Sequence, residues 1–532
     1  MFVFRMDQVF ASNYYLDILS MTPSWAWAYL LLGASLIAGY VVLNEKPGPW
    51  PILCSFLMYV GLFVLSQYPT MVFRDVYLHG GLTLQVLNNG LATSGYPQWW
   101  PGAFVLWAIS LVTTGMSVFE SDIVLVLVTQ SVIACLFYLI GRRVNGERLA
   151  SAAGALYLVS SVYFYQDLNH FSPALLSIAL FLALLYLLIR SGPVLMTQCF
   201  SVLLATGLIL VHPLGIVFVL GGLLVSRLLK AESSMGSYTV IGLVAFAVIL
   251  DVTWILNSAQ FSVIELSRIV LYALTDPTGT KLGTIILSPF GAEQLSVVGY
   301  VLQDYYFKPM LGVIGVLALL GYVRMRGQPL VKFLGTFFLG CLLVSATVFV
   351  SGRFEQGLQI ERALTYALIP AVFLVVSFLS KSRRRLVLVG LIFLLLVPSF
   401  YASRTFFSQY ESSDHSWQTV TYSFLSNHST ASITTDRNTA IYYGYFVPNQ
   451  TVNGALFLLQ YSQQNLTDLS YIVATKGLFL RSFEMELIEN PYQPSVSARQ
   501  LFWEQVDMKL DSTTSINRLY SDGLMTAYLT GQ

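Results

Sequence analysis

The chain has 532 residues, of which 56% are hydrophobic and only 10% are charged, and its mean hydropathy is +0.68. Soluble globular domains carry about 25% charged residues, so this composition excludes a water-soluble protein. The formal net charge of +1 gives no whole-protein field that would favour nucleic acid as a partner. The sequence therefore predicts a multi-pass membrane protein.

The first 401 residues form an almost continuous series of apolar segments joined by short connections. A helix needs about 20 residues to cross ~30 Å of hydrocarbon, and many of these segments reach or approach that length. The run 99–118 either crosses the membrane or lies along its outer interface, because Trp99 and Trp100 at its start suit an interfacial entry. The other predicted spans are 24–43, 50–67, 122–141, 149–163, 174–190, 195–211, 214–229, 238–256, 306–323, 330–350, 363–380 and 386–401.

Residues 402–532 are rich in polar residues and contain no spanning segment, so they are read as a folded domain of about 130 residues, a normal domain size. Candidate strands are Ala431–Thr435, Ser470–Ala474 and Met525–Leu529. Asn517–Gly523 supplies turn residues before the last of them. The pattern predicts a small α/β domain.

Basic residues cluster in alternate connections between the predicted spans, and under the positive-inside rule these connections face the cytoplasm. The loops 164–173, 257–305 and 351–362 and the 402–532 domain then lie outside. The basic clusters are Arg142, Arg143 and Arg148; Arg190; Arg227 and Lys230; Arg324, Arg326 and Lys332; and Lys381, Arg383, Arg384 and Arg385.

Three loops carry ionisable residues at the edges of apolar spans, and two of the three are placed outside by loop charge. The side of the first, 68–98, depends on whether 99–118 crosses. If all three share the outer face, a carboxylate could accept a proton from an attacking hydroxyl, and arginine could bind phosphate oxygens by paired hydrogen bonds. This combination favours transfer of a group from a lipid phosphate, although each residue alone could be an interfacial anchor. The three clusters are Arg74, Asp75, Tyr77 and His79; Asp167 and His170; and Arg353, Glu355, Glu361 and Arg362.

Within the predicted spans, Asp251 and His212 stand out, and a locally satisfied polar residue is the simpler interpretation of each. Pro213 follows His212 and could end a helix there. Asp75 and His79 are four residues apart and could share a helix face, where a hydrogen bond between them is favoured over a metal site. The chain has no P-loop, dinucleotide fingerprint, zinc-protease motif or serine elbow.

The arrangement resembles the GT-C superfamily of integral-membrane glycosyltransferases, which use polyprenyl-phosphate-linked sugars. It looks most like the archaeal and bacterial relatives of protein O-mannosyltransferases. The resemblance rests on four short stretches spread over most of the chain. They are Arg74–His79, with its acid just past an early span, Tyr96–Gly102, Asn169–Pro173 and Glu361-Arg362.

The resemblance implies an all-α membrane bundle with about twelve spans and interfacial helices, followed by the α/β exoplasmic domain. It places 68–98 outside and 99–118 along the outer interface, and it implies inverting transfer with a possible Mg or Mn requirement. Asp75 would be the base, Asp167 a second acid, and Arg362 and Arg353 the groups that bind the lipid phosphate. Residues implied to bind the acceptor or support the site are Arg74, Tyr77, His79, His170 and Glu355.

Two departures from the family pattern matter. An additional span, 24–43, precedes the one that leads into Asp75. Val76 follows Asp75, unlike the Asp-Glu pair of protein O-mannosyltransferases, which counts against serine or threonine of a protein as the acceptor.

The alternatives to an enzyme are a transporter or flippase of a lipid-linked substrate and an assembly protein. Transporters often show internal repeats and polar midplane helices, and neither is evident here.

Overall fold

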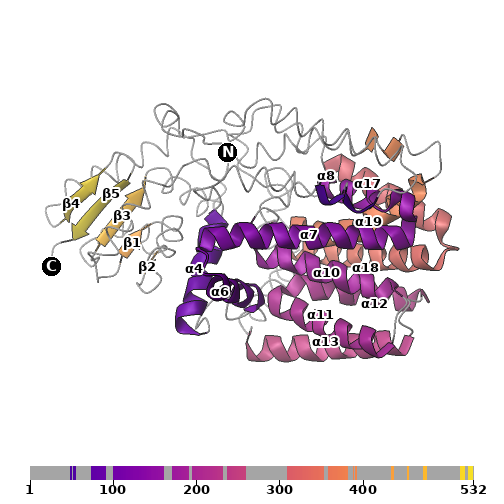
Figure 1. Cartoon of the computed structure of the whole chain (residues 1–532), viewed down its shortest axis with the longest axis horizontal. Helices are drawn as coiled ribbons and strands as arrows, with labels where there is room; N and C mark the ends of the chain where they lie inside the picture. The colour runs from indigo at the N-terminus through magenta and orange to yellow at the C-terminus, as the bar shows by residue number, and fades with distance from the viewer. Residues whose placement is uncertain are drawn as a thin grey trace, which may run out of the picture. The chain divides into compact units, whose positions relative to one another are not determined.

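The computed structural model describes the helices of a membrane bundle and the strands of a separate sheet (Figure 1). The chain divides into two compact units, one of Asp17–Ser66 and Thr93–Tyr410, the other of Met1–Leu16, Gln67–Ala92 and Glu411–Gln532. The described residues are 48–50, 52–54, 74–90, 100–160, 170–190, 194–231, 237–258, 308–352, 358–380, 387–388, 390–391, 433–435, 452–453, 471–475, 516–521 and 525–530.

Helices follow one another through the first of these units in the places where apolar runs predicted them. In Figure 1 the longer helices of its middle part run side by side across the view. The predicted spans 24–43 and most of 50–67 and 386–401 lie outside the described residues. The helices are α6 (Gly102–Thr114), α7 (Val118–Asn145), α8 (Ala152–Ser160), α10 (Pro173–Ile189), α11 (Val194–Val211), α12 (Pro213–Leu228), α13 (Ser237–Asn257), α17 (Lys308–Met325), α18 (Pro329–Gly352) and α19 (Leu358–Leu379).

Length and composition together mark three of the described helices as able to cross a membrane: Val118–Asn145, Thr239–Asn257 and Pro329–Thr347. Several shorter apolar helices of the described chain pack beside them. Helix α10, for example, contacts both α7 and α11, and its side chains are buried almost all round. A helix that is apolar on all sides belongs in a membrane bundle or a large core. The described fold is therefore a helical membrane bundle.

Local sequence explains where the helices begin and end. Ser117 and Glu120 form a capping box at the start of α7, because each side chain accepts a hydrogen bond from the backbone N–H of the other. Ser172 caps α10 and is followed by Pro173 at the first helical position. Val211 ends α11 and Pro213 begins α12, with His212 as the cap between them. The prediction that a helix ends at His212-Pro213 is thus confirmed.

Helix α6 is short. Its 13 residues rise only about 20 Å, which is less than the ~30 Å of a bilayer core. Gly115 ends it in the left-handed conformation, with φ of 68°, and donates to the Leu111 carbonyl. Figure 1 shows that α6 is not aligned with the long helices beside it. Length and direction therefore favour the interfacial interpretation of 99–118 over a span.

Glycines allow the closest approach between α12 and α18. A Cβ on Gly340 would lie 2.6 Å from the Gly222 Cα and closer still to the Gly221 carbonyl oxygen. Small residues at such crossings let two membrane helices pack backbone to backbone. The α12–α18 contact thus depends on the absence of side chains at these positions.

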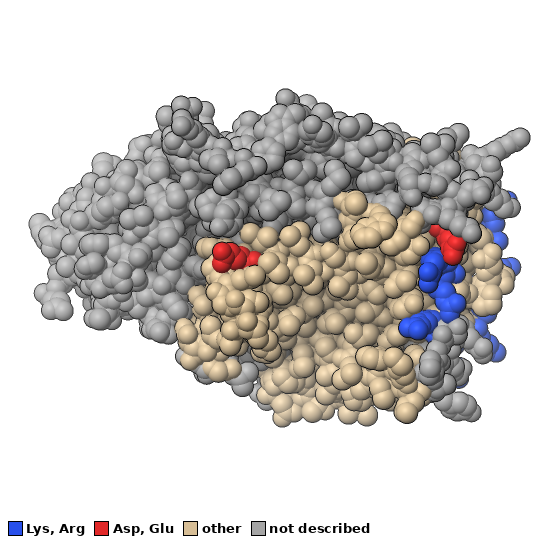
Figure 2. Space-filling view, viewed as in Figure 1, with Lys and Arg blue, Asp and Glu red and all other residues tan. Residues whose placement is uncertain are grey.

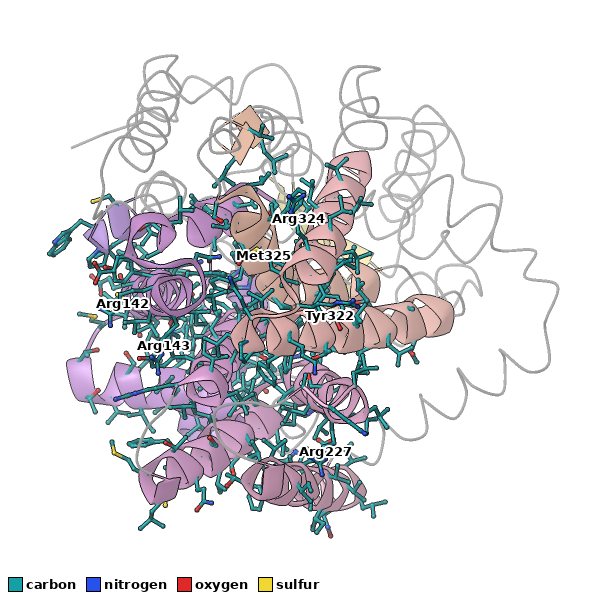
Figure 3. All side chains as sticks on the ribbon, turned by 90° about the vertical axis from the view of Figure 1, so that its right-hand side faces the viewer. Arg142, Arg143, Arg227, Tyr322, Arg324 and Met325 are labelled. Atoms are coloured by element: carbon teal, nitrogen blue, oxygen red, sulfur yellow. The ribbon has the colours of Figure 1, made fainter. Side chains whose placement is uncertain are left out.

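The described Lys and Arg side chains of the bundle gather at one end, which we call the basic end. Figure 2 shows Lys and Arg there, and Figure 3 looks onto this end with Arg142, Arg143, Arg227 and Arg324 labelled. The first pair ends α7, and the other two end α12 and α17. The sequence predicted that these alternate connections share one membrane face, and the structure confirms that they share one end of the bundle.

The second unit contains a five-stranded mixed sheet of order β2-β1-β3-β5-β4. Strand β1 pairs in parallel with β2 and β3, whereas β5 pairs antiparallel with β3 and β4. The strands are β1 (Ile433–Thr435), β2 (Val452–Asn453), β3 (Tyr471–Thr475), β4 (Ile516–Ser521) and β5 (Met525–Thr530).

The strands β1, β3 and β5 confirm the three predicted from sequence. The turn predicted over Asn517–Gly523 is wrong over most of its length, because Ile516–Ser521 forms β4. This segment pairs antiparallel with β5, and the pairing outweighs the turn preference of its residues. The helices predicted for the 402–532 domain lie outside the described residues.

Candidate functional site

The first predicted cluster lies on α4 (Arg74–Asn89), a helix of the unit that contains the sheet. Asp75 and His79 are four residues apart on it, so they lie on one face, as the spacing predicted. The side chains of 74–78 lie outside the described residues, and the Asp75–His79 hydrogen bond stays a prediction. His79 is partly buried, and its carbonyl accepts a 2.8 Å hydrogen bond from the Thr83 hydroxyl.

The second predicted cluster precedes α10. Asp167 lies outside the described residues, whereas His170 is fully buried and Phe171 is 1% exposed. The Ser172 hydroxyl accepts a hydrogen bond of 3.1 Å from the Leu175 N–H and so begins the helix. The last residues of this loop are therefore packed into the end of the bundle.

A buried carboxylate that the sequence analysis did not single out holds the same segment. Asp122 lies in the second turn of α7, is 1% exposed, and accepts a 2.7 Å hydrogen bond at Oδ1 from the Phe171 N–H. The Phe171 ring meets Trp107 of α6 edge to face, with centroids 5.7 Å apart. The sequence held one feature that could have pointed to Asp122 as a candidate residue, because it is an acid at the first position of the apolar run 122–141.

The third predicted cluster lies around the start of α19. Arg353 and Glu355 lie outside the described residues, and Arg362 is within the helix although its side chain is not described. Four residues on, Tyr366 lies on the same face as Arg362 and is 2% exposed. Tyr366 therefore belongs to the bundle core, and Arg362 lies one helical turn before it, toward the start of α19.

Tyr366 joins α19 to α10 and α12 by polar and aromatic contacts. Its hydroxyl lies 2.8 Å from the Ser177 hydroxyl of α10, and both residues are buried. Its ring stacks on Phe218 of α12 at 5.0 Å and meets Phe181 of α10 at 5.3 Å. These contacts fix the first half of α19 against the helix that begins at Pro173.

The start of α19 lies at the end of the bundle opposite the basic end. Asn145, at the end of α7 beside Arg142 and Arg143, donates hydrogen bonds to the Phe373 carbonyl at 3.0 Å and the Ser377 hydroxyl at 2.7 Å. The second half of α19 therefore lies at the basic end. The starts of α7, α10 and α19 share the opposite end, which bears Asp122, His170 and the backbone of Arg362.

Helix starts and the backbone of Arg362 lie at this opposite end, and helix starts and arginine side chains are groups that bind anionic lipid heads. No group of three or more His, Cys, Asp and Glu side chains that could hold a metal is found among the described residues. The side chains of Asp75 and Asp167 are not among those described.

Comparison with known proteins gives a fold and no sequence family. No family model matches the chain, and no curated protein matches it. A crystal structure of ArnT from Cupriavidus metallidurans bound to undecaprenyl phosphate matches with a TM-score of 0.51 and 11% identity, over 90% of this chain and 97% of that one. ArnT from the same organism in the apo state matches with a TM-score of 0.48 and 10% identity, over 95% of this chain and 98% of the other.

At this identity the likeness concerns the fold, and it extends over nearly the whole of both chains. This likeness of fold agrees with the resemblance carried by Arg74–His79 and Glu361-Arg362. The chain therefore shares its fold with ArnT.

Proposed function

We propose that this protein is a membrane glycosyltransferase that moves a sugar from a polyprenyl-phosphate donor to an acceptor at the outer face of the membrane. One observation carries the proposal: the fold matches, over 90% of the chain, that of ArnT bound to undecaprenyl phosphate. A shared fold alone does not imply a shared reaction. The proposal therefore also draws on the residues available at the end of the bundle opposite its basic end.

On the donor side, Arg362 binds the lipid phosphate, with Arg353 as a second cation and Glu355 as a supporting residue. The position of Arg362 near the start of α19 supports this role, because a polyprenyl phosphate keeps its head at the interface and its chain among the helices. Guanidinium groups bind phosphate oxygens in a bidentate manner. They also stabilise the charge that the phosphate gains as the sugar leaves.

On the acceptor side, Asp75 takes the proton of the attacking hydroxyl, and Asp167 is the second acid. Arg74, Tyr77, His79 and His170 line or support the acceptor position. The acceptor oxygen attacks the anomeric carbon while the bond to the phosphate oxygen breaks, and the bonding electrons leave with polyprenyl phosphate. A single displacement of this kind inverts the anomeric configuration. Asp75 acts in the manner of a general base.

The orientation of the protein follows from its charge. The basic end faces the cytoplasm under the positive-inside rule, so the starts of α7, α10 and α19 face outward. We place the 402–532 domain on the same outer side of the membrane.

Replacement of Asp75 tests the acceptor side of this proposal. Purified protein in proteoliposomes is assayed with a panel of polyprenyl-phosphate-linked hexoses and pentoses and with membrane glycans and lipids as acceptors. We expect Asp75→Asn to lower the transfer rate by about 100-fold or more, because removal of a general base costs 10²–10⁴-fold. The amide has the size of the carboxylate but cannot take the proton.

Asp251→Asn is the matched control, since it makes the same chemical change at a half-buried position of α13. We expect it to transfer sugar at the wild-type rate. An unchanged rate in Asp75→Asn, with both proteins folded, would refute the catalytic role of Asp75. Movement of the intact donor between leaflets by the wild type, without transfer, would identify a flippase.

A further inference from the structure

Asp122 is a buried acid for which the proposed reaction has no use. A carboxylate that is 1% exposed is costly to bury unless its hydrogen-bonding capacity is met. In this case its Oδ1 accepts a 2.7 Å bond from the Phe171 N–H. An apolar residue at this position would avoid the free-energy cost of desolvating a carboxyl group. We therefore look for the role of Asp122 in its hydrogen bond with Phe171.

The contact fixes a junction of three elements. Asp122 belongs to α7, and Phe171 lies directly before the capping residue Ser172 that begins α10. The Phe171 ring packs against Trp107 of α6. The backbone N–H of Phe171 precedes the helix and has no intrahelical acceptor, so the carboxylate supplies one. The hydrogen bond and the aromatic contact together hold the segment 170–172 in one place.

The segment held in this way connects both predicted sides of the site. His170 immediately precedes Phe171, and Asp167 lies four residues before Phe171 in the chain. In the other direction, Ser177 of α10 is hydrogen-bonded to Tyr366, one helical turn from Arg362 on α19. The start of α10 therefore lies between an acceptor-side loop, whose end Asp122 holds directly, and the helix that carries the donor-side arginine.

We propose that Asp122 is a positioning residue for sugar transfer, which anchors the Phe171 N–H and thereby aligns the end of the second external loop with the start of α10. This inference rests on the proposed function. Asp122 does not touch the reacting atoms and acts through the backbone that it holds. Misplacement of reacting groups by about 1 Å can cost about 100-fold in rate.

Three variants test the inference in proteoliposomes. Asp122→Ala removes the acceptor of the Phe171 N–H, and we expect kcat per folded protein to fall about 100-fold, while KM for the donor stays within about threefold. Asp122→Asn keeps an oxygen that can accept the same bond, and its kcat should stay within about fivefold of the wild type. Hydrogen exchange in the peptide that contains Phe171 should accelerate in the alanine variant only.

Asn145→Ala is the control for a merely structural effect. It removes a side chain of the same helix that donates to Phe373 and Ser377 at the basic end, so it should lower the melting temperature and leave kcat per folded protein unchanged. Wild-type kcat in Asp122→Ala, or an equal loss in Asn145→Ala, would overturn the inference. A folded wild type that transfers no sugar would overturn the proposed function and the role of Asp122 with it.

Discussion

Arg362 is the residue on which the donor side of the site depends. It lies one helical turn before Tyr366, whose hydroxyl is 2.8 Å from that of Ser177. We expect Arg362→Ala to weaken the binding of polyprenyl phosphate by about 10- to 100-fold, because hydrogen bonds to a charged group contribute about 1.5–3 kcal/mol. Equilibrium binding of polyprenyl phosphate to the purified protein measures this loss.

Arg324→Ala provides the matched control, because Arg324 ends α17 at the basic end (Figure 3). It should bind polyprenyl phosphate as the wild type does. Equal losses in the two variants would mean that arginine acts through overall charge and would contradict a phosphate site at Arg362.

Single residues also show where sequence reasoning stops. The acid Asp75 was selected because it follows an apolar run and matches a family motif. Asp122 lacks both signals, since it begins a span and resembles a helix-start acid beside Glu120. Its role depends on Phe171, which is 49 residues away in sequence. A contact of that separation is set by helix packing, which no local pattern encodes.

At the scale of elements, the glycine contact between α12 and α18 predicts a steric effect. We expect Gly340→Ala to destabilise the bundle by about 1–3 kcal/mol, as insertion of extra volume into a packed core does, because the new Cβ would clash with the backbone of Gly221 and Gly222. Gly242→Ala is the control, since a Cβ on Gly242 has no neighbour within 4 Å. Thermal unfolding in detergent compares the two, and equal melting temperatures would contradict the backbone contact.

Element positions were predictable because apolar runs and helix caps are local. Ser172-Pro173 and His212-Pro213 set the starts of α10 and α12 to within a residue or two of the prediction. The run 99–118 was ambiguous because hydropathy measures apolar length and not where a helix ends. Gly115 ends α6 after 13 residues, and only the structure shows this. Strand β4 was missed because its partner β5, rather than its own residues, decides its conformation.

For the whole molecule, composition was sufficient to predict a helical membrane protein, and loop charge predicted that alternate connections would share a face. Figure 3 shows that four arginines from three of these connections share one end. The sequence placed Asp75, Asp167 and Arg362 near one another only through the family resemblance. Hydropathy and charge assign residues to a side of the membrane, but they do not determine the distance between residues on that side.

The measurement that tests the central claim most directly is the fate of the donor in proteoliposomes that contain the purified wild-type protein. Polyprenyl-phosphate-linked sugars are supplied with membrane glycans and lipids as acceptors, and mass spectrometry and NMR follow the products. We predict that free polyprenyl phosphate appears in step with a glycosylated acceptor whose anomeric configuration is inverted. Donor that crosses the bilayer intact, with no polyprenyl phosphate released, would contradict a glycosyltransferase.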